Sequence, residues 1–466
     1  MAPTFETNVI RSIFLRGLAI IYLIAFASLL PQLDGLIGSH GILPASEYLG
    51  NIRAEYGTSA YTFFPTLAWL NSSDLFLHVL VWAGLVFSGL LLAGFLPLPA
   101  TIALYVLYLS VDTVGQTFYS FQWDSLLLEV GFAAVLLAPT GIRPSYSSPP
   151  TRLAVWVFRL LIFRLMLESG AVKLLSGDHT WRNLTALTYH YETQPLPTPV
   201  AWYAHHLPLF VQRASVLGVF AIELVIPFFF LATRRLRQIA AFVTIGLQLL
   251  IAVTGNYAFL NLLTILLCAF LFDVTSTKHT PWNAWLVGIV LIPIGVLQAI
   301  GTFGILSRLP EPLASIDARA EVFHMVNHYG LFAIMTTSRP EIVIEGSDDG
   351  QEWKTYGFRY KPGDLRRPLQ WVAPYQPRLD WQMWFAALSN YQENPWFQRL
   401  MVRLLEGSPQ VTALFESNPF SDKPPRFVRA VTYDYHFTDS STRRSTGAIW
   451  SRTPAGEYFP TVSLRR

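Results

Sequence analysis

The sequence predicts a polytopic α-helical membrane domain followed by a smaller soluble α+β domain. Apolar residues make up 52% of the 466 residues and charged residues only 14%, against about 25% charged in typical soluble proteins. This deficit of charge is concentrated before residue 306, where long apolar runs follow one another. After residue 306 the runs become shorter and are broken by turn residues, which is typical of a soluble domain with strands.

Nine apolar runs are candidates for membrane spans, since a helix needs about 20 mostly apolar residues to cross the hydrocarbon core. Two of the runs are short, so eight spans is the alternative count. The first run is not followed by a small-residue cleavage pattern, so we expect it to remain as a signal anchor. The nine ranges are 12–30, 75–96, 98–117, 124–139, 152–175, 209–231, 237–254, 257–273 and 282–305.

The distribution of basic residues predicts the orientation of these spans, because cytoplasmic loops are enriched in Lys and Arg. With the N-terminus inside, the outer loop 31–74 contains Arg53 as its only basic residue. The loop 176–208 and the whole chain after residue 306 then lie on the luminal or outer side. The predicted inner segments hold Arg11, Arg16, Arg143, Arg152, Arg234, Arg235, Arg237 and Lys278.

The soluble part shows alternating helix and strand signals. Residues 341–358 form two β-rich runs around Ser-Asp-Asp-Gly at 347–350, a hairpin signal. Residues 377–405 are expected to be helical, with Asn394-Pro395 suited to a helix start, and Ser408 opens another short helix. Residues 427–437 alternate as a strand. The predicted organisation is a membrane domain at 1–305 with ordered luminal loops 31–74 and 176–208, an α+β domain at 306–438 and a polar, partly disordered tail at 439–466.

Ionisable residues inside the predicted spans point to a buried site. A charge in lipid is costly, so such residues usually face a protein interior or a wet cavity and mark functional sites. Arg164 and Glu168 lie four apart on one helix face and can pair, whereas Glu129 and Glu223 have no basic residue nearby in sequence. These two must carry a proton or reach a base across the bundle. The candidate network comprises Asp124, Glu129, Arg159, Arg164, Glu168, Lys173 and Glu223.

Two interpretations of this network remain open. It is either a structural network that fixes the register of the helices or the wall of a lumen-facing cavity with a reactive group. Lys173 is the catalytic candidate in the second case, because it lies near the luminal end of its span and burial can make a lysine a base or nucleophile. The following loop adds further candidates or merely interfacial anchors: Asp178, His179, Trp181, Arg182, His190 and Glu192.

Several function classes are not indicated. A net charge of +3 without a basic stripe argues against nucleic-acid binding. One cysteine, Cys268, excludes an intramolecular disulfide and a cysteine-based zinc site. His324 and His328 are four apart, on one face if the segment is helical, but Met325 stands where a zinc protease has Glu. No metal or cofactor site is therefore predicted. Asn71-Ser-Ser and Asn183-Leu-Thr match the glycosylation pattern on predicted luminal loops.

Long segments of the sequence resemble the lipase maturation factor family. In the membrane part these are GSHGILPASEYL (38–49), FQWDSLLLEVGFAAVLLAP (121–139), the loop 176–208 and GNYAFLNLL (255–263). In the soluble part they are RPEIVIEGSDDGQEWKTYGFRYKPGD, LDWQMWFAAL, NPWF and PPRFVRAVTYDYHF. The resemblance implies a multi-pass endoplasmic-reticulum protein with a luminal C-terminal domain. Such a protein is needed for newly made secreted lipases to fold and assemble into active dimers.

The chain departs from the animal members in two respects, because it lacks their luminal cysteines and its soluble domain ends soon after the last shared run. This indicates a compact relative, and for a bacterial relative the outer side would be the periplasmic or extracellular face of the inner membrane. The membrane part is also distantly similar to the vitamin K-dependent carboxylase type of domain, whose base lysine would correspond to Lys173. That group has a histidine shortly after a tryptophan, whereas here Trp123 is followed by Asp124 and no histidine.

Two functions follow from these observations. The first is a membrane-embedded maturation factor, or chaperone, whose soluble domain holds a partly folded client such as a secreted lipase near the membrane surface. The second is an integral-membrane enzyme that uses a lysine-centred cavity on a lipid- or quinone-like substrate. A transporter is a weaker third option, because no inverted repeat is present. The predicted partners are the lipid bilayer and a secreted client, and the sequence leaves the oligomeric state open.

Overall fold

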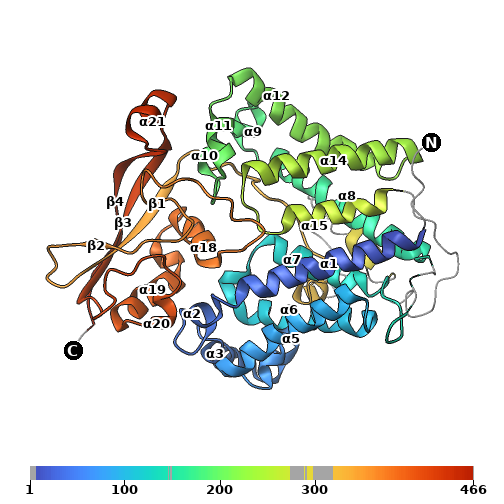
Figure 1. Cartoon of the computed structure of the whole chain (residues 1–466), viewed down its shortest axis with the longest axis horizontal. Coiled ribbons are helices and arrows are strands. Elements are labelled where there is room, and N and C mark those ends of the chain that lie inside the picture. Colours follow the sequence, from blue (N-terminus) through green and yellow to red (C-terminus); the bar gives the residue numbers. More distant parts are fainter. Residues whose placement is uncertain are drawn as a thin grey trace.

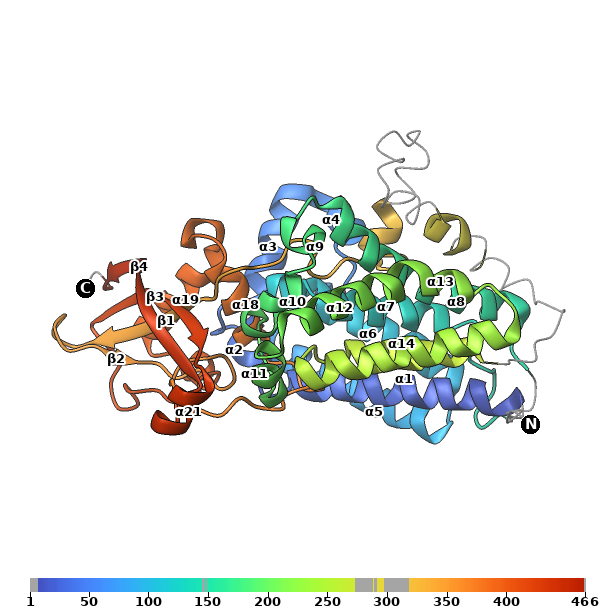
Figure 2. The same cartoon turned by 90° about the horizontal axis from the view of Figure 1, so that it is seen from above.

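A helical bundle with a small β-sheet domain at one end makes up the chain, as the two perpendicular views show (Figure 1; Figure 2). This computed structural model describes residues 7–144, 146, 149–272, 288, 291–296 and 318–464. The first described helix, at residues 7–29, begins at the end of the bundle that is remote from the sheet (Figure 2). The sheet domain is therefore attached to the opposite end of the bundle.

Apolar side chains dominate the bundle helices, which run roughly along the long axis of the molecule (Figure 2). In the part that the structure describes, five helical segments are long and apolar enough to cross a membrane: Ile10–Leu29, Asp74–Ala93, Pro97–Tyr119, Leu209–Phe229 and Arg234–Thr254. The elements are α1 (Thr7–Leu29), α5 (Asp74–Ala93), α6 (Pro97–Gly115) with η3 (Gln116–Tyr119), α7 (Gln122–Ala134), α8 (Arg152–Leu175), α12 (Leu209–Phe220), η4 (Ala221–Val225), α13 (Ile226–Phe229), α14 (Arg234–Thr254), α15 (Leu260–Leu267) and η5 (Cys268–Leu271).

Capping residues in the sequence define several of these helix ends. Ser73 accepts a hydrogen bond from the Phe76 amide before α5, and Thr151 accepts one from the Ala154 amide before α8. Gly94, at a φ of 78°, ends α5 in the left-handed region that favours glycine. Pro97 then occupies the first turn of α6, where a missing amide hydrogen costs nothing.

Four of the nine predicted spans differ from this set. The range 124–139 becomes α7, which has only 13 residues. The range 257–273 becomes the short apolar segment Leu260–Leu271. The range 152–175 is α8, long enough to cross but rich in charged residues. Most of the range 282–305, like Lys278, lies outside the described residues.

The connections at the sheet end are folded. The loop 31–74 contains α2 (Leu33–Ile37), α3 (Ala45–Tyr56) and α4 (Ala60–Phe63), together with the short 3₁₀ turns η1 (Gly57–Ser59) and η2 (Leu67–Trp69). Residues 176–208 contain α9 (His179–Arg182), α10 (Ala186–Thr193) and α11 (Pro199–His205). Gly35 of α2 lies so close to the soluble domain that a Cβ there would be 2.5 Å from the Gln410 carbonyl oxygen. Loop 31–74 is thus packed against the sheet domain.

The sheet domain is built on a four-stranded antiparallel sheet with strand order β2-β1-β3-β4. Glu345 pairs with Thr355 in the β1–β2 hairpin, and Val343 pairs with Val431 between β1 and β3. Helix α19 packs its apolar face inward and ends at Gly407, which has a φ of 69°. The elements are β1 (Pro340–Ser347), β2 (Lys354–Thr355), α18 (Arg378–Ala387), η6 (Tyr391–Glu393), α19 (Pro395–Glu406), α20 (Pro409–Thr412), β3 (Phe427–Phe437), α21 (Ser440–Thr446) and β4 (Trp450–Val462).

The C-terminal segment, expected as a partly disordered tail from residue 439, instead completes the sheet. Asp439 caps α21 by accepting hydrogen bonds from the Ser441 and Thr442 amides. Strand β4 then pairs with β3 along most of its length. Its polar composition misled the prediction because β4 is an edge strand, and most of its side chains are exposed.

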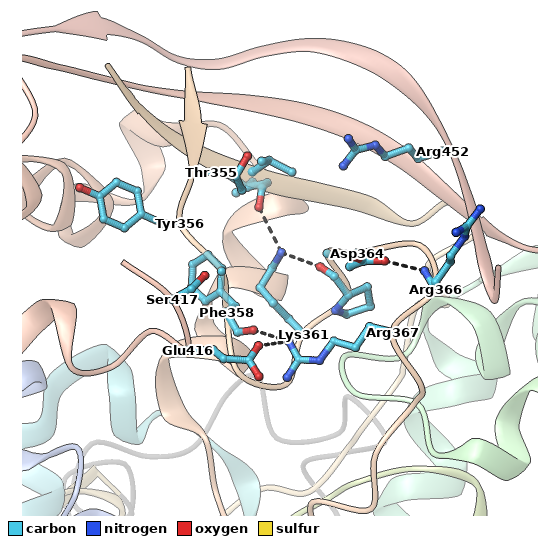
Figure 3. Close-up of a pocket in the computed structure, with 15 residues that line it drawn as sticks. Thr355, Tyr356, Phe358, Lys361, Asp364, Arg366, Arg367, Glu416, Ser417 and Arg452 are labelled. Atoms are coloured by element: carbon cyan, nitrogen blue, oxygen red, sulfur yellow. Dashed lines mark hydrogen bonds and ion pairs between the residues drawn. The ribbon is translucent and has the colours of Figure 1, made fainter. Parts of the chain in front are cut away.

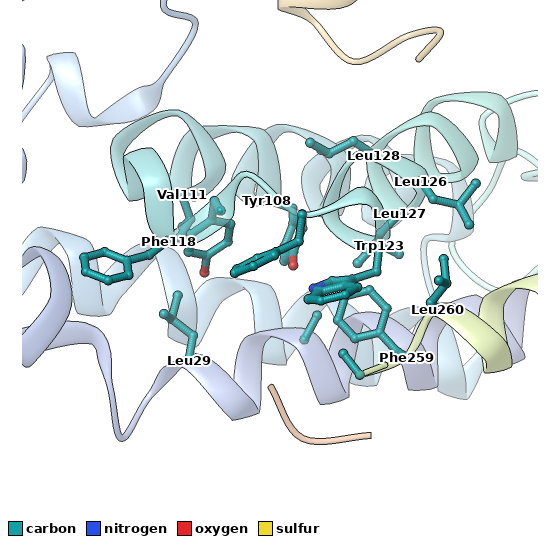
Figure 4. Packing of buried hydrophobic residues seen from close by; sticks show 14 of the residues in the cluster. Leu29, Tyr108, Val111, Phe118, Trp123, Leu126, Leu127, Leu128, Phe259 and Leu260 are labelled. Atoms are coloured by element: carbon teal, nitrogen blue, oxygen red, sulfur yellow. The ribbon is translucent and has the colours of Figure 1, made fainter. Parts of the chain in front are cut away.

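In the described part of the chain the most extensive hydrophobic core runs from the bundle into the sheet domain, and two smaller clusters accompany it. Its aromatic centre is Trp123 of α7, whose ring lies 4.7 Å from the Phe121 ring and 4.6 Å from the Trp381 ring of α18. Figure 4 shows Trp123 beside Phe259 and the neighbouring leucines. Because bundle and domain share these contacts, they form one packed unit.

Candidate functional site

The Lys173 side chain lies inside the bundle at the sheet end of α8 and is 5% exposed. Its ammonium group donates a hydrogen bond to the Glu223 carboxylate at 2.7 Å and another to the Ser169 carbonyl oxygen at 2.9 Å. The same nitrogen is 5.5 Å from the centre of the Trp181 ring. The charge is therefore compensated by one carboxylate and one aromatic face.

The partner carboxylate is carried by a π-helical turn, η4, inserted between α12 and α13. A π turn adds one residue to a helix and rotates the side chains that follow, and such turns are frequent at functional sites. Gly170 of α8 allows the close approach, because a Cβ there would lie 2.8 Å from Glu223 Cβ and 2.9 Å from Leu224 Cδ2. The geometry of this ion pair therefore depends on a small residue facing an irregular turn.

A cavity of about 130 Å³ adjoins this ion pair. Leucine, isoleucine, valine, methionine and phenylalanine side chains form most of its wall. Its polar lining residues, apart from Lys173 and Glu223, are Gln122, Ser169, Trp181, His190, Gln248, Tyr257, Asn261 and Thr264.

A second buried network links α7 and α8 to the chain before the sheet domain. Arg164 is 2.9 Å from Glu129 and 3.2 Å from Glu168, and all three side chains are almost fully buried. Glu129 also accepts hydrogen bonds from the Asn327 amide at 2.8 Å and the Tyr329 hydroxyl at 2.6 Å. One guanidinium thus serves two carboxylates, whose other donors come from segment 324–329, and the network fixes the position of this segment between the helices.

A third buried pair joins Asp124 of α7 to Arg378 of α18. Each guanidinium NH₂ nitrogen lies 2.9 Å from one carboxylate oxygen, and the Tyr108 hydroxyl donates to the same carboxylate. The guanidinium carbon is 3.4 Å from the centre of the Tyr119 ring. The predicted network is thus divided into three separate ion-pair clusters.

Arg159 belongs to none of the three clusters. Its Nε donates to the Phe270 carbonyl oxygen at 2.9 Å, and its guanidinium lies 5.7 Å from the Trp156 ring. This arginine connects α8 to η5 instead of pairing with one of the predicted acids.

The loop candidates fall into three groups. Asp178 caps α9, accepts a hydrogen bond from the Met335 amide, and has its pKa lowered by these hydrogen bonds despite partial burial. His179 and Arg182 are exposed on the surface. Trp181 and His190 line the cavity beside Lys173.

Glu192 faces the sheet domain instead of the cavity. Its carboxylate accepts from the Phe437 amide at 2.7 Å and lies 3.2 Å from His436 Nδ1. In the same contact the Arg339 guanidinium donates to three backbone carbonyls of the loop, those of Glu192, Gln194 and Pro195. This end of the loop is therefore held by the soluble domain.

The two histidines at 324 and 328 do not share a helix face, because the described helical turn ends at residue 322. His324 lies 3.3 Å from Asp112 and binds Asn327, whereas His328 is exposed. Among the residues that the structure describes, no group of three metal-binding side chains comes together.

The sheet domain contains a larger, open groove of about 660 Å³ (Figure 3). Most of its charges are already paired: Lys361 lies 2.8 Å from Glu341, and Arg367 lies 2.7 Å from Glu416. The guanidinium carbon of Arg452 lies over the Tyr433 ring, 4.1 Å from its centre. Because three of its four cations, Lys361, Arg367 and Arg452, are held by internal partners, this groove is the weaker candidate for a ligand site.

Sequence reasoning did not identify the partners from the second half of the chain. These partners come from the range 306–438, which the sequence predicts as a separate domain. They are Asn327, Tyr329, Arg339 and Arg378. The only available signal was that a buried acid needs a cationic partner. This requirement predicts the charge of the partner but not its position in the sequence. Asn261 and Tyr257 were visible only as parts of an aromatic and amide-rich turn at 255–263.

Comparison with known proteins identifies both parts of the chain. The family model described as the lipase maturation factor transmembrane domain matches residues 9–279, and the model of the lipase maturation factor C-terminal domain matches residues 325–460. These matches do not favour the carboxylase-type interpretation of the membrane part. No solved protein structure matches the chain.

Individual relatives agree over nearly the whole length. The chain is 36% identical to lipase maturation factor 2 of Gallus gallus, an alignment that covers 97% of this chain and 81% of the relative. It is 36% identical to lipase maturation factor 2 of Homo sapiens, covering 97% and 82%. It is 35% identical to lipase maturation factor 1 of Mus musculus, covering 97% and 87%. Both domain matches and these identities show that the chain belongs to the lipase maturation factor family.

Proposed function

We propose that the chain is a membrane-embedded maturation factor that assists the folding and assembly of secreted lipases or similar exported proteins. The observation that supports this most is the match of both family domains in one chain, in the order membrane part and then C-terminal part. The fold adds a physical reason. The sheet domain is fixed to one end of the bundle by buried ion pairs, so it is a rigid platform next to the bilayer.

Apolar side chains on this platform are the proposed client contacts. Phe385 of α18 and Leu388, which follows the last residue of this helix, lie three residues apart and are 42% and 43% exposed. The Phe385 ring is 6.0 Å from the Phe121 ring of the bundle, which places it at the junction of the two parts. Exposed apolar groups at such a junction can bind the unfinished core of a client close to the membrane surface.

The test is co-expression with a secreted lipase in cells that lack their own lipase maturation factors. We expect the full chain to raise lipase activity per amount of lipase protein in the medium and to co-purify with the lipase. The double variant Phe385→Ser with Leu388→Ser should lower both readings at an unchanged level of the factor. Val402→Ser is the matched control, because Val402 is 42% exposed on α19 of the same domain.

Absence of any gain in specific lipase activity, with co-purification at background, would refute the proposed function. An unchanged gain in the Phe385 and Leu388 variant would refute only the proposed contact surface. Deletion of residues 306–466 is not an informative variant, because it removes Arg378 and leaves the Asp124 carboxylate buried without its cation.

The orientation that we propose places the N-terminus in the cytoplasm and the sheet domain in the lumen or outside the cell. Its support is the position of a basic connection: the turn between α13 and the arginine-rich start of α14 lies at the end opposite the sheet (Figure 2), as the positive-inside rule requires of a cytoplasmic connection. The membrane would be that of the endoplasmic reticulum in a eukaryote and the inner membrane in a bacterium. We further propose that α8 and segment 260–271 also cross, within eight or nine spans.

Glycosylation mapping tests this orientation. Asn71 and Asn183 are exposed at the sheet end, and a reporter sequon can be added after Arg466. Expression in mammalian cells should glycosylate the reporter, whereas a reporter at the N-terminus should remain unmodified. The reverse pattern would place the sheet domain in the cytoplasm and refute the orientation.

The enzyme alternative is not favoured by the geometry. The Lys173 nitrogen is directed at the Glu223 carboxylate, 2.7 Å away, and at the Ser169 carbonyl oxygen, 2.9 Å away, so the protein itself engages the group that the enzyme alternative would need for a substrate. The double substitution Lys173→Met with Glu223→Gln removes both charges while keeping the volume of the side chains. A maturation factor should keep its effect on lipase activity in this variant, whereas an enzyme that depends on Lys173 would lose it.

A further inference from the structure

Two buried hydrogen-bond acceptors in the cavity beside Lys173 have no donor in the described part of the chain. The first is Oδ1 of Asn261, a residue that is 5% exposed. The amide nitrogen of the same side chain donates to the Gln248 carbonyl oxygen at 2.8 Å. This hydrogen bond fixes the orientation of the amide, so the unpaired atom is an oxygen that accepts.

The second acceptor is Nδ1 of His190, and its protonation follows from a chain of hydrogen bonds. The Tyr257 hydroxyl donates to Gln194 Oε1 at 2.9 Å, because the Gln194 amide nitrogen is already used by the Thr254 carbonyl oxygen. The Tyr257 oxygen therefore accepts from His190 Nε2, 3.2 Å away. Nδ1 is left with a lone pair, as expected for neutral imidazole.

The environment keeps this imidazole neutral. Burial, and to a smaller extent the positive charge of Lys173, together lower the pKa of His190 to about 4. The cavity thus presents two acceptors of different chemistry, an amide oxygen and an imidazole nitrogen, on a mostly apolar wall. An acceptor that is buried without a donor is unfavourable and requires an occupant that supplies an O–H or N–H group.

The lone pairs in the cavity disfavour anionic occupants. The two charged lining residues, Lys173 and Glu223, are paired with each other, so their charges cancel. A carboxylate or phosphate placed in the cavity would face the lone pairs of Asn261 and His190 and would be repelled. The chemistry therefore favours an uncharged ligand with a hydroxyl donor and an apolar body.

Size and surroundings indicate how much of such a ligand is enclosed. A volume of about 130 Å³ is small beside the roughly 300–1,000 Å³ of pockets that enclose a whole drug-sized ligand, so it accommodates a head group and not a whole lipid. Val219 of α12 and Ile251 of α14 belong to the wall. The same two helices expose Leu217 and Leu250 on their outer surface, which is suited to lipid. A chain that leaves between α12 and α14 enters the bilayer.

We propose that this cavity binds the hydroxyl head group of an uncharged membrane lipid, which donates to Asn261 Oδ1 or His190 Nδ1 while its hydrocarbon chain extends into the bilayer between α12 and α14. No covalent step is involved. The proposed site binds the lipid without any chemical reaction. It is independent of the client contacts that we propose on the sheet domain.

Three probes that share the same hydrocarbon tail test the proposal on the purified full-length protein in detergent. Oleyl alcohol carries the hydroxyl donor, methyl oleate carries no donor, and oleate carries a charge. We expect radiolabelled oleyl alcohol to bind saturably and to raise the midpoint of thermal unfolding. Methyl oleate and oleate should compete at least about tenfold more weakly, which corresponds to the loss of one hydrogen bond. Equal competition by methyl oleate would overturn the proposal. That result would mean that the cavity is filled by water or accepts any hydrocarbon chain, and that the hydroxyl group of the ligand does not contribute to binding.

Two substitutions assign the site. Asn261→Leu removes the acceptor and should weaken oleyl alcohol binding about tenfold, and Ile251→Trp should block the cavity if the first variant fails to fold. Thr244→Val is the matched control, because Thr244 is fully buried on α14 with an unpaired hydroxyl but does not line the cavity. Unchanged binding in both site variants, or an equal loss in Thr244→Val, would overturn the assignment.

Discussion

Arg378 of α18 and Asp124 of α7 form a bidentate ion pair across the junction between the sheet domain and the bundle, with both nitrogen–oxygen distances at 2.9 Å. Both side chains are completely buried. They are separated by 254 residues in the sequence. The attachment of the soluble domain therefore depends on one buried charge from each half of the chain.

Arg378→Met is expected to destabilise the protein by about 3–5 kcal/mol, because the Asp124 carboxylate would remain buried without its cation. The measurement is the midpoint of thermal unfolding of the purified protein in detergent. Arg399→Met is the control, since Arg399 pairs with Glu47 at a position where both side chains are 44% exposed, and such pairs contribute at most about 1 kcal/mol. Equal losses of stability in the two variants would mean that the buried ion pair contributes no more to stability than the exposed one.

Gly170→Ala is expected to cost about 1–3 kcal/mol, as overpacking usually does. The added methyl group would collide with Glu223 and Leu224 and push η4 away from Lys173. Gly218→Ala on α12 is the control, because nothing lies within 4 Å of its added Cβ. Thermal unfolding of both variants tests this prediction, and a stable Gly170→Ala protein would show that the π turn can move freely.

His190 should make stability depend on pH below neutrality. Its pKa is lowered to about 4 in the folded protein, against about 6.5 in an unfolded chain. The unfolded chain thus binds more protons in this window, and stability falls as the pH drops from about 6.5 towards 4. The difference between the wild type and His190→Phe isolates this contribution. His40→Gln, at an exposed histidine, should leave the profile unchanged.

Local sequence signals predicted much of the soluble domain. Strand β3 has the predicted bounds, Phe427–Phe437. Helix α19 begins at Pro395 after Asn394, and α20 follows Ser408, which caps it. The single helical region 377–405 is divided in the structure, because α18 ends at Ala387 and η6 intervenes. These elements depend on caps and alternation, which the sequence displays directly.

The site could be predicted only as a set of charges in need of partners. Arg164 and Glu168 are neighbours on one helix, so their contact followed from the spacing. Lys173 and Glu223 are 50 residues apart, and their contact depends on the π turn and on Gly170. The sequence contains no signal for an extra residue in a helix, and helix propensity is the same for both geometries. The donor-free atoms in the cavity are likewise a product of packing.

The loop carbonyls that Arg339 binds and the carboxylate that Arg378 neutralises have a consequence for biosynthesis. During translation Asp124 and the backbone of residues 192–195 are synthesised well before Arg339 and Arg378. A nascent chain therefore contains these hydrogen-bond acceptors before their cationic partners exist. Membrane insertion alone leaves the protein unfinished, and its last third supplies the closing contacts. A prematurely terminated product would expose that deficit to cellular quality control.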